Sequence, residues 1–198
     1  MRVFRFHLIA VALVLLDQCT KLAVKGFSFM GITHQGMYLG QSEPLIGDIV
    51  RLTFVENPGS AFGLEWGSAK IVLTLATVII AAALGWYLYK IRTGSMLLQT
   101  AIMLLLAGAV GNLIDRTFYG VAYGQAGLFL GSVVDFVQLD IPDMNIMGTV
   151  WTHWPVFNVA DSCVTVGIAL LLGLEIVAGF RKKKGPTAEP NTTDHQAP

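Results

Sequence analysis

The sequence is poor in charge. Asp, Glu, Lys and Arg make up only 13% of its 198 residues, whereas about a quarter is usual for soluble domains. Hydrophobic residues account for 54%, and the mean hydropathy is +0.63. This composition suits lipid better than water, so a membrane protein is expected. The formal net charge of zero lacks the basic excess of nucleic-acid-binding proteins, and no nucleic-acid partner is predicted.

Cysteine and histidine are also scarce. Cys19 and Cys163 both lie within apolar runs, which excludes a disulfide framework. The four histidines have no metal-ligand spacing, and the sequence has no H-E-x-x-H motif. A G-x-S-x-G motif and a Cys–His arrangement are missing too. We therefore predict no metal, no cofactor, and neither a serine nor a cysteine nucleophile.

Long apolar runs are what the sequence does contain. They predict helices at about residues 4–24, 70–90, 93–115 and 157–180, each close to the roughly 20 residues that cross a hydrocarbon core. The first run follows Arg2 and Arg5, as the core of a signal peptide would. Neither a small-residue cleavage site nor a lipobox follows, because Asp17 and Gln18 precede Cys19. This segment is therefore predicted to remain as a helix.

Basic residues gather beside one set of predicted helix ends. Short basic loops stay in the cytoplasm, so both termini and the loop near residue 91 are predicted to lie inside. Residues 25–69 and 116–156 then lie outside. We expect one membrane domain over residues 1–184 and a disordered cytoplasmic tail over 185–198. The basic residues are Arg2, Arg5, Lys90, Arg92 and those at 181–184.

The two outer segments are predicted to be folded structures on the membrane surface. Residues 50–54 alternate strictly between apolar and polar side chains, which is typical of a half-buried strand. The Asn57-Pro58-Gly59-Ser60 stretch that follows has the composition of a turn. The second outer segment is rich in glycine and aromatic residues.

Polar residues interrupt three of the predicted helices. A charge inside a membrane helix costs about 2.5–3.5 kcal/mol, so each needs a compensating role. Residues three or four apart share a helix face, and all three groups fall near the outer helix ends. The convergence of polar groups from three helices at one level indicates a functional site. The groups are Asp17 with Lys21, Asn112 with Asp115 and Arg116, and Asn158 with Asp161.

A purely structural role for these polar groups competes with a site. Interhelical hydrogen bonds, at roughly 0.6 kcal/mol each, would hold a bundle together without chemistry, and for Asp17 and Lys21 this role has equal weight. Glu175 is assigned to that structural class, because it lies near the inner helix end and reaches water there. A proton-coupled transporter would need polar residues through the full membrane depth, yet the inner halves are nearly bare. If the protein were a non-catalytic scaffold, the acidic cluster would have to serve only the packing of the helices.

Carboxylates are the groups left to carry chemistry. Two aspartates held close together cannot both ionise, so one keeps a proton while the other takes one from water. Such a pair hydrolyses a peptide bond without a cofactor. Asp161 is the predicted first member, because it lies in an apolar helix with no basic residue within one turn. Spacing alone leaves its partner open among Asp115, Asp135, Asp140 and Asp143.

Five motifs in a fixed order make the sequence resemble the bacterial lipoprotein signal peptidases, also called signal peptidase II. Together they span residues 17–162. The patterns are D-Q-x-S/T-K, N-x-G-x-A-F, G-N-L-x-D-R, V-V-D-F and F-N-x-A-D-S. They stand here as Asp17-Gln18-Cys19-Thr20-Lys21, Asn57-Pro58-Gly59-Ser60-Ala61-Phe62, Gly111-Asn112-Leu113-Ile114-Asp115-Arg116, Val133-Val134-Asp135-Phe136 and Phe157-Asn158-Val159-Ala160-Asp161-Ser162.

The resemblance implies a catalytic pair of Asp135 and Asp161. It implies an aspartic endopeptidase that removes the signal peptide from a prolipoprotein, immediately before the diacylglyceryl-modified cysteine. Its partners would be that substrate and membrane lipid, and it would act as a monomer at the outer face of the bacterial cytoplasmic (inner) membrane. Residues implied to bind substrate or support the pair are Asp17, Lys21, Asn57, Asn112, Asp115, Arg116 and Asn158.

The implied fold is an all-α membrane protein with four transmembrane helices, a small extracytoplasmic β-sheet and a helix-bearing outer loop. One departure from the family concerns length. The stretches 116–135 and 135–157 are long for it, and the part with Asp140, Pro142 and Asp143 is expected to be a local elaboration without a catalytic role.

Overall fold

A computed structural model describes residues 4–59, 69–146 and 149–183. Its long helices are α1 (Arg5–Lys25), α2 (Ala69–Lys90), α3 (Met96–Ile114) and α5 (Val159–Lys183). Within these ranges four helices are long and apolar enough to cross a membrane, which confirms the predicted number. The predicted tail at 185–198 and the Ser60, Ala61 and Phe62 positions of the second motif lie outside the described residues.

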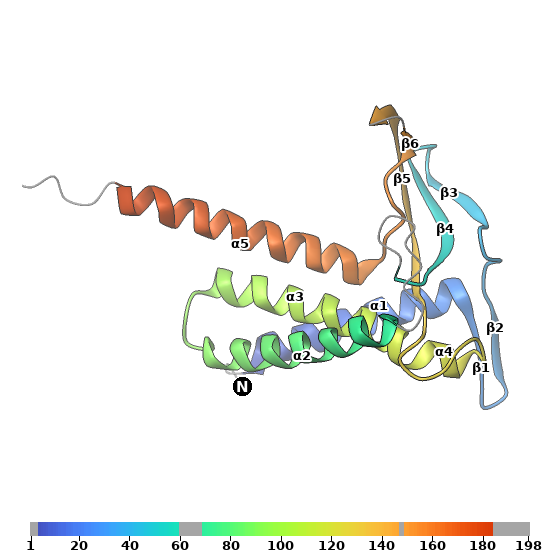
Figure 1. Cartoon of the computed structure of the whole chain (residues 1–198), viewed down its shortest axis with the longest axis horizontal. Helices are drawn as coiled ribbons and strands as arrows, with labels where there is room; N and C mark the ends of the chain where they lie inside the picture. Colours follow the sequence, from blue (N-terminus) through green and yellow to red (C-terminus); the bar gives the residue numbers. More distant parts are fainter. Residues whose placement is uncertain (1–3, 60–68, 147–148, 184–198) are drawn as a thin grey trace, which may run out of the picture.

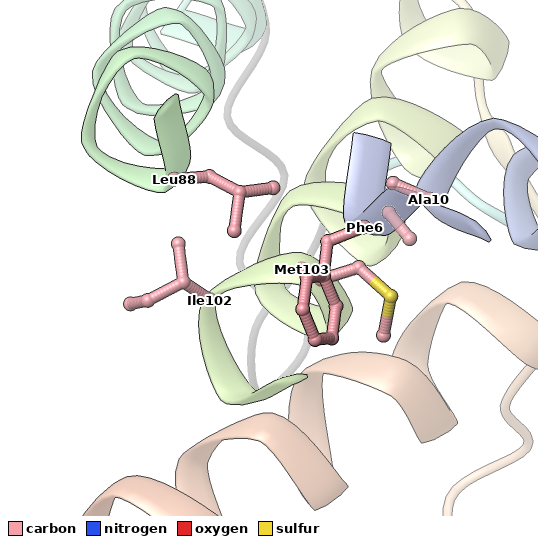
Figure 2. Close-up of a cluster of buried hydrophobic side chains, with 6 residues drawn as sticks. Phe6, Ala10, Leu88, Ile102 and Met103 are labelled. Carbon is pink, nitrogen blue, oxygen red and sulfur yellow. The ribbon is translucent and has the colours of Figure 1, made fainter. Parts of the chain in front are cut away.

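Helix α3 is the centre of the bundle, because it packs against α1, α2 and α5. Figure 2 shows an apolar cluster where α1 begins, α2 ends and α3 begins, at the bundle end far from the strands. Helix α3 starts at a conventional cap, since the Ser95 hydroxyl accepts a hydrogen bond from the Leu98 amide. The labelled cluster residues are Phe6, Ala10, Leu88, Ile102 and Met103.

The third helix continues past residue 115, where it was predicted to end. It runs on as a π-helix, η2 (Asp115–Tyr119), and a final turn, α4 (Gly120–Ala122). Charged residues at 115 and 116 suggested an end, but the ion pair with Lys21 and the hydrogen bonds from Gln18 and the Val134 amide offset the cost of Asp115 inside the helix. A π-helical turn of this kind is rare and is found often at functional sites.

Strands correct the expectation of an all-α protein. β1 (Gly26–Phe29) pairs with β2 (Ile32–Gln35) in a hairpin. β3 (Ser42–Ile46), β4 (Val50–Asn57), β5 (Val133–Ile146) and β6 (Thr149–His153) form an antiparallel sheet in the order β3-β4-β5-β6. The strand predicted at 50–54 is confirmed within β4, and the small predicted sheet exists. Its members β5 and β6 arise from the long second outer segment, in which no strand was predicted although residues 137–141 alternate between apolar and polar side chains.

A separate helix-bearing outer loop is not seen in the described outer residues. The helical turns there are η2 and α4, which are continuous with α3. Residues 60–68, between β4 and α2, are outside the described range.

The sheets lie across one end of the helix bundle, as Figure 1 shows. This is the end where α1 and α3 finish and α5 begins. A second apolar cluster joins the sheet to the helix ends, and it places the middle strands directly over them. Its buried members are Val24, Phe54, Tyr119, Val134 and Phe136.

Candidate active site

Lys21 is the buried cation at the centre of the polar end of the bundle. Its ammonium lies 2.9 Å from Asp17 Oδ2 on the same helix and 2.8 Å from Asp115 Oδ2 on η2. It also donates to Asn112 Oδ1 at 2.9 Å. The Lys21 side chain is 0% exposed, and leaving so deeply buried a charge unpaired would be strongly destabilising. Lys21 therefore ties α1 to the outer end of the third helix.

Asp17 and Asp115 each extend the network to another element. Asp17 Oδ1 accepts from the Ala160 amide in the first turn of α5 at 2.8 Å. Asp115 Oδ2 accepts from the Val134 amide on β5 at 3.1 Å. The charge cluster thus fixes the start of α5 and the strand that follows α4.

Gln18 is a member of this network that the sequence analysis did not assign. Its amide donates to Asp115 Oδ1 at 2.9 Å and to the Gly111 carbonyl at 3.1 Å. Its own carbonyl accepts from the Tyr119 hydroxyl at 3.1 Å. The only signal for Gln18 was its place in the D-Q-x-S/T-K motif beside Asp17. Tyr119 gave no signal, because it lies on the unpredicted continuation of the helix.

Asn112 connects the buried cation to Asp161. Its Oδ1 accepts from Lys21, and its Nδ2 donates to Asp161 Oδ1 at 2.8 Å. Small residues on α3 allow this close approach, because a Cβ at Gly111 would lie 2.7 Å from Asp17 Oδ2. One turn earlier, a Cβ at Gly108 would lie 2.4 Å from the Ala160 carbonyl. Helices α3 and α5 therefore touch through backbone at the level of the site.

Asn158 and Asp161 cap α5 reciprocally. Asn158 Oδ1 accepts from the Asp161 amide at 2.8 Å, and Asp161 Oδ2 accepts from the Asn158 amide at 3.2 Å. This is the arrangement of a capping box, with Asn and Asp in the two positions. The backbone of the first helical turn therefore fixes the direction of the Asp161 carboxylate.

Asp135 reaches the same place from the sheet. Its Oδ1 accepts from Asn158 Nδ2 at 2.7 Å, and its side chain is buried. On β5 it alternates with Val134 and Phe136, whose side chains pack in the apolar cluster on the other face of the strand. Asn158 thus hydrogen-bonds to both Asp135 and Asp161, and it brings a strand-borne and a helix-borne carboxylate together.

The pKa of Asp135 is raised to about 7. Burial is the largest cause, and the negative charge of Asp161 is the second. Hydrogen bonds from Asn57 and Asn158 act in the opposite direction, because they stabilise the ionised form. The shift means that the carboxylate pair retains a proton near neutral pH.

Asn57 and Arg116 border the pair on the sheet side. Val55 pairs with Asp135 across β4 and β5. Asn57 lies two residues after Val55, so it is the diagonal neighbour of Asp135 on the same face of the sheet. Asn57 hydrogen-bonds to Asp135, and its Oδ1 accepts from the Gly59 amide at 2.9 Å. The predicted turn is therefore present up to Gly59, whose φ of 90° suits glycine. A Cβ at Gly59 would lie 2.7 Å from Arg116 Nη1.

An ion pair outside the predicted set holds the end of β4. Lys25 Nζ pairs with the Glu56 carboxylate, and it donates to Gln125 Oε1 at 3.0 Å. The ammonium also lies 4.1 Å from the centre of the Tyr123 ring. Glu56 directly precedes Asn57. The sequence signal for Lys25 was its place one turn after Lys21 on the same face of α1.

Of the four spacing-compatible partners of Asp161, the geometry favours Asp135. Asp115 is committed to Lys21, Gln18 and the Val134 amide. Asp140 and Asp143 are exposed on β5, five and eight residues beyond Asp135, and about 3.3 Å per residue carries them well away. No three His, Cys, Asp or Glu side chains among the described residues are grouped to hold a metal ion.

A groove of about 550 Å³ opens beside Asp161. The start of α5 forms one wall, and the chain that returns from β6 forms the other. The walls are mainly apolar, so the groove offers an apolar ligand access to Asp161. The lining residues furthest from Asp161 along α5 are Thr165 and Val166, while Leu139, Trp154 and Pro155 face them.

Buried charges in the described residues occur at one end of the bundle only. They belong to Asp17, Lys21, Asp115 and Asp135, all within the network beneath the sheet. A proton-conducting path would require such groups through the full depth of the membrane. The arrangement fits a surface-level reaction site instead.

Comparison with known proteins places the chain in a family. A model of the family described as signal peptidase (SPase) II matches residues 9–177. Among curated relatives, a lipoprotein signal peptidase of Chlorobaculum tepidum is 37% identical, covering 84% of this chain and 91% of its own. Another lipoprotein signal peptidase, from Pelodictyon phaeoclathratiforme, is 35% identical and covers 96% of this chain and 97% of its own.

Solved structures agree with these sequence relatives. A structure described as that of a bacterial membrane enzyme has a TM-score of 0.62 and 31% identity, covering 93% of this chain and 94% of the other. A second structure with the same description has a TM-score of 0.59 and 33% identity, and it covers 84% of this chain and 89% of the other. The protein is thus a multi-pass membrane protease belonging to the signal peptidase II family.

Proposed function

We propose that this protein is an aspartic endopeptidase that removes the signal peptide from prolipoproteins, with Asp135 and Asp161 as its catalytic pair. The cut would fall immediately before the diacylglyceryl-modified cysteine. The observation that carries the proposal is the double contact of Asn158, whose amide groups hold the two carboxylates at one place. The relatives' name, lipoprotein signal peptidase, supplies the substrate class.

The reaction follows from a pair that holds one proton. The ionised carboxylate takes a proton from a water molecule, and the water oxygen attacks the scissile carbonyl carbon. The protonated carboxyl donates to the carbonyl oxygen as negative charge develops there. When the tetrahedral intermediate collapses, the amine that leaves takes up the proton first removed from water. The carboxylate that had donated its proton recovers one from a hydroxyl of the intermediate as the carbonyl re-forms, so the pair returns to its starting state.

The surrounding residues position this pair and take no part in making or breaking covalent bonds. Asn112 and Asn158 hold Asp161 and Asp135 by hydrogen bonds that leave little rotational freedom. Lys21 pairs with both Asp17 and Asp115 and donates to Asn112, so it keeps Asn112 in position on the third helix. This follows the general rule that a catalytic group needs a supporting shell to keep its geometry.

The site's level in the membrane suits a lipid-modified substrate. The network lies where membrane-spanning helices end, under the sheet. Acyl chains on the substrate cysteine must remain in hydrocarbon, which brings the adjacent peptide bond to this level. The apolar groove beside Asp161 gives the extended chain next to that bond a place to lie.

Substitution of each aspartate by asparagine tests the pair. Asp135→Asn and Asp161→Asn keep the side-chain volume and remove the ionisable proton, so we expect cleavage to fall roughly 10²–10⁴-fold in each. The assay measures release of the signal peptide from a diacylated prolipoprotein in detergent, with a chelator present throughout. The wild type should remain active under these conditions.

Asp143→Asn is the matched control, since this aspartate is exposed on β5 away from the network. It should cleave like the wild type, and all three variants should elute as folded protein. Full activity of either site variant would refute the assigned pair. Loss of wild-type activity with the chelator would show that a metal takes part.

A further inference from the structure

The β1–β2 hairpin begins where a membrane-spanning helix ends. Helix α1 finishes at Lys25, and β1 starts at Gly26, whose φ of 80° turns the chain sharply. The base of the hairpin is closed by backbone contact, because a Cβ at Gly36 would lie 2.3 Å from the Gly26 nitrogen. The Met37 amide adds a hydrogen bond of 2.7 Å to the Val24 carbonyl. The hairpin is therefore held at the level of the helix end.

The register gives the hairpin two unlike faces. Phe27 pairs with His34, and Phe29 pairs with Ile32, so these side chains share one face. Ser28 pairs with Thr33 on the opposite face, where their hydroxyls lie 3.1 Å apart. No charged residue occurs between Lys25 and Glu43.

The tip of the hairpin is apolar and unusually exposed. Phe29 is 68% exposed, Met30 at the turn 87%, and Ile32 67%. Figure 1 shows the hairpin running across the helix axes and past the side of the bundle that carries α2 and α4. The tip therefore projects beyond the bundle at the height where α1 ends.

We propose that the β1–β2 hairpin lies in the head-group layer of the membrane, with Phe29, Met30 and Ile32 in the boundary with the acyl chains. Three observations meet here: continuity with a spanning helix, a hairpin without Asp, Glu, Lys or Arg, and an apolar tip that overhangs the bundle. Aromatic and aliphatic side chains at this depth bind lipid by burial of apolar area, as in monotopic anchors. The inference concerns lipid contact alone and does not depend on the proposed reaction.

Spin labels on the two faces test this placement. The labels are attached through Phe29→Cys, Met30→Cys and Thr33→Cys, each in a background with Cys19→Ala and Cys163→Ala. All three label sites are exposed, so the fold should tolerate them. Proteoliposomes of phosphatidylethanolamine and phosphatidylglycerol are then probed with oxygen, which partitions into lipid, and with a water-soluble nickel chelate.

Labels at Phe29 and Met30 should collide more often with oxygen than with the nickel chelate. The label at Thr33, on the polar face of the same hairpin, should show a clearly lower ratio of oxygen to nickel collisions. Ile79→Cys on α2, where the native side chain is 70% exposed, provides the lipid-facing reference. Equal ratios at Phe29 and Thr33, or nickel collisions at Met30 as frequent as in free solution, would overturn the proposal whether or not the protein cleaves substrate.

Discussion

Asp135 is buried on a strand, while its acidic neighbour Asp161 lies on a helix. Burial and that neighbour together raise the pKa of Asp135 to about 7, and the hydrogen bonds from Asn57 and Asn158 limit the rise. A raised carboxyl pKa means that the proton stays bound through the acidic range and is lost as the pH rises through about 7. The shared proton belongs to the pair, so activity should follow this loss.

The pH dependence of cleavage tests this residue-level conclusion. With one proton required on the pair, kcat/KM should fall on the alkaline side with an apparent pKa of about 7, and by about tenfold for each further pH unit. The measurement is initial-rate cleavage in detergent from pH 5 to 9, with folding checked at each pH. A rate that stays constant across this range would contradict a one-proton pair.

The sequence singled out individual residues where the signal was local. Asp161 stood out because an isolated carboxylate in an apolar helix is costly. Its partner could not be chosen by spacing, since Asp135 reaches the site through the pairing of β4 with β5, which joins residues about 80 positions apart. The family motif named Asp135, whereas Gln18 and Tyr119 emerged only from the packed structure.

Helices α3 and α5 form the element-level support of the site. Their backbones approach at Gly108 and Gly111, where side chains of any size would collide with Ala160 or Asp17. Helix α3 carries Asn112, and α5 carries Asp161, so the spacing of these two helices sets the length of the hydrogen bond between them.

Substitution of Gly108 by alanine should separate the two helices. The new Cβ would lie 2.4 Å from the Ala160 carbonyl and 2.5 Å from a Val164 methyl group. Overpacking of this kind costs about 1–3 kcal/mol, so we expect a lower thermal unfolding midpoint in detergent together with reduced cleavage. Gly173→Ala on α5 is the control, because no atom lies within 4 Å of its added Cβ. Equal midpoints for the two variants would show that the approach at Gly108 is not tight.

Elements with a strong local pattern were predictable. Apolar runs revealed the four helices, and alternation revealed β4. The continuation of the third helix was missed because the charges of Asp115 and Arg116 resembled a membrane boundary, although the ion pair with Lys21 stabilises Asp115 inside a π-helix. Strands β5 and β6 were not predicted, although residues 137–141 of β5 alternate as residues 50–54 do, and their pairing with each other and with β4 is visible only in the structure.

The whole molecule is divided by polarity along its long axis. Apolar packing of Phe6, Leu88 and Ile102 fills one end (Figure 2), and the buried charges gather at the other, beneath the sheets. Basic residues such as Arg5, Lys90 and Arg92 lie at the apolar end. The positive-inside rule then predicts that this end lies in the cytoplasm and that the site lies outside.

Reporter fusions test the orientation of the whole chain. Alkaline phosphatase requires disulfides that form outside the cytoplasm, so a fusion after residue 143 should be active and a fusion after residue 183 inactive. A reporter that functions only in the cytoplasm should give the reverse pattern at the same two positions. High phosphatase activity at residue 183 would place the C-terminal end of α5 outside and invert the proposed topology.

Asn158 has a consequence for inhibition. Its side-chain nitrogen is within hydrogen-bond reach of Asn112 Oδ1, the Val134 carbonyl and Asp135, while its oxygen caps α5. Any other residue at this position would leave several buried groups without partners, at about 1–3 kcal/mol for each. A compound that binds Asp161 in the groove therefore contacts a carboxylate whose buried support, Asn158, cannot mutate without loss of its hydrogen bonds to α5, β5 and Asp135.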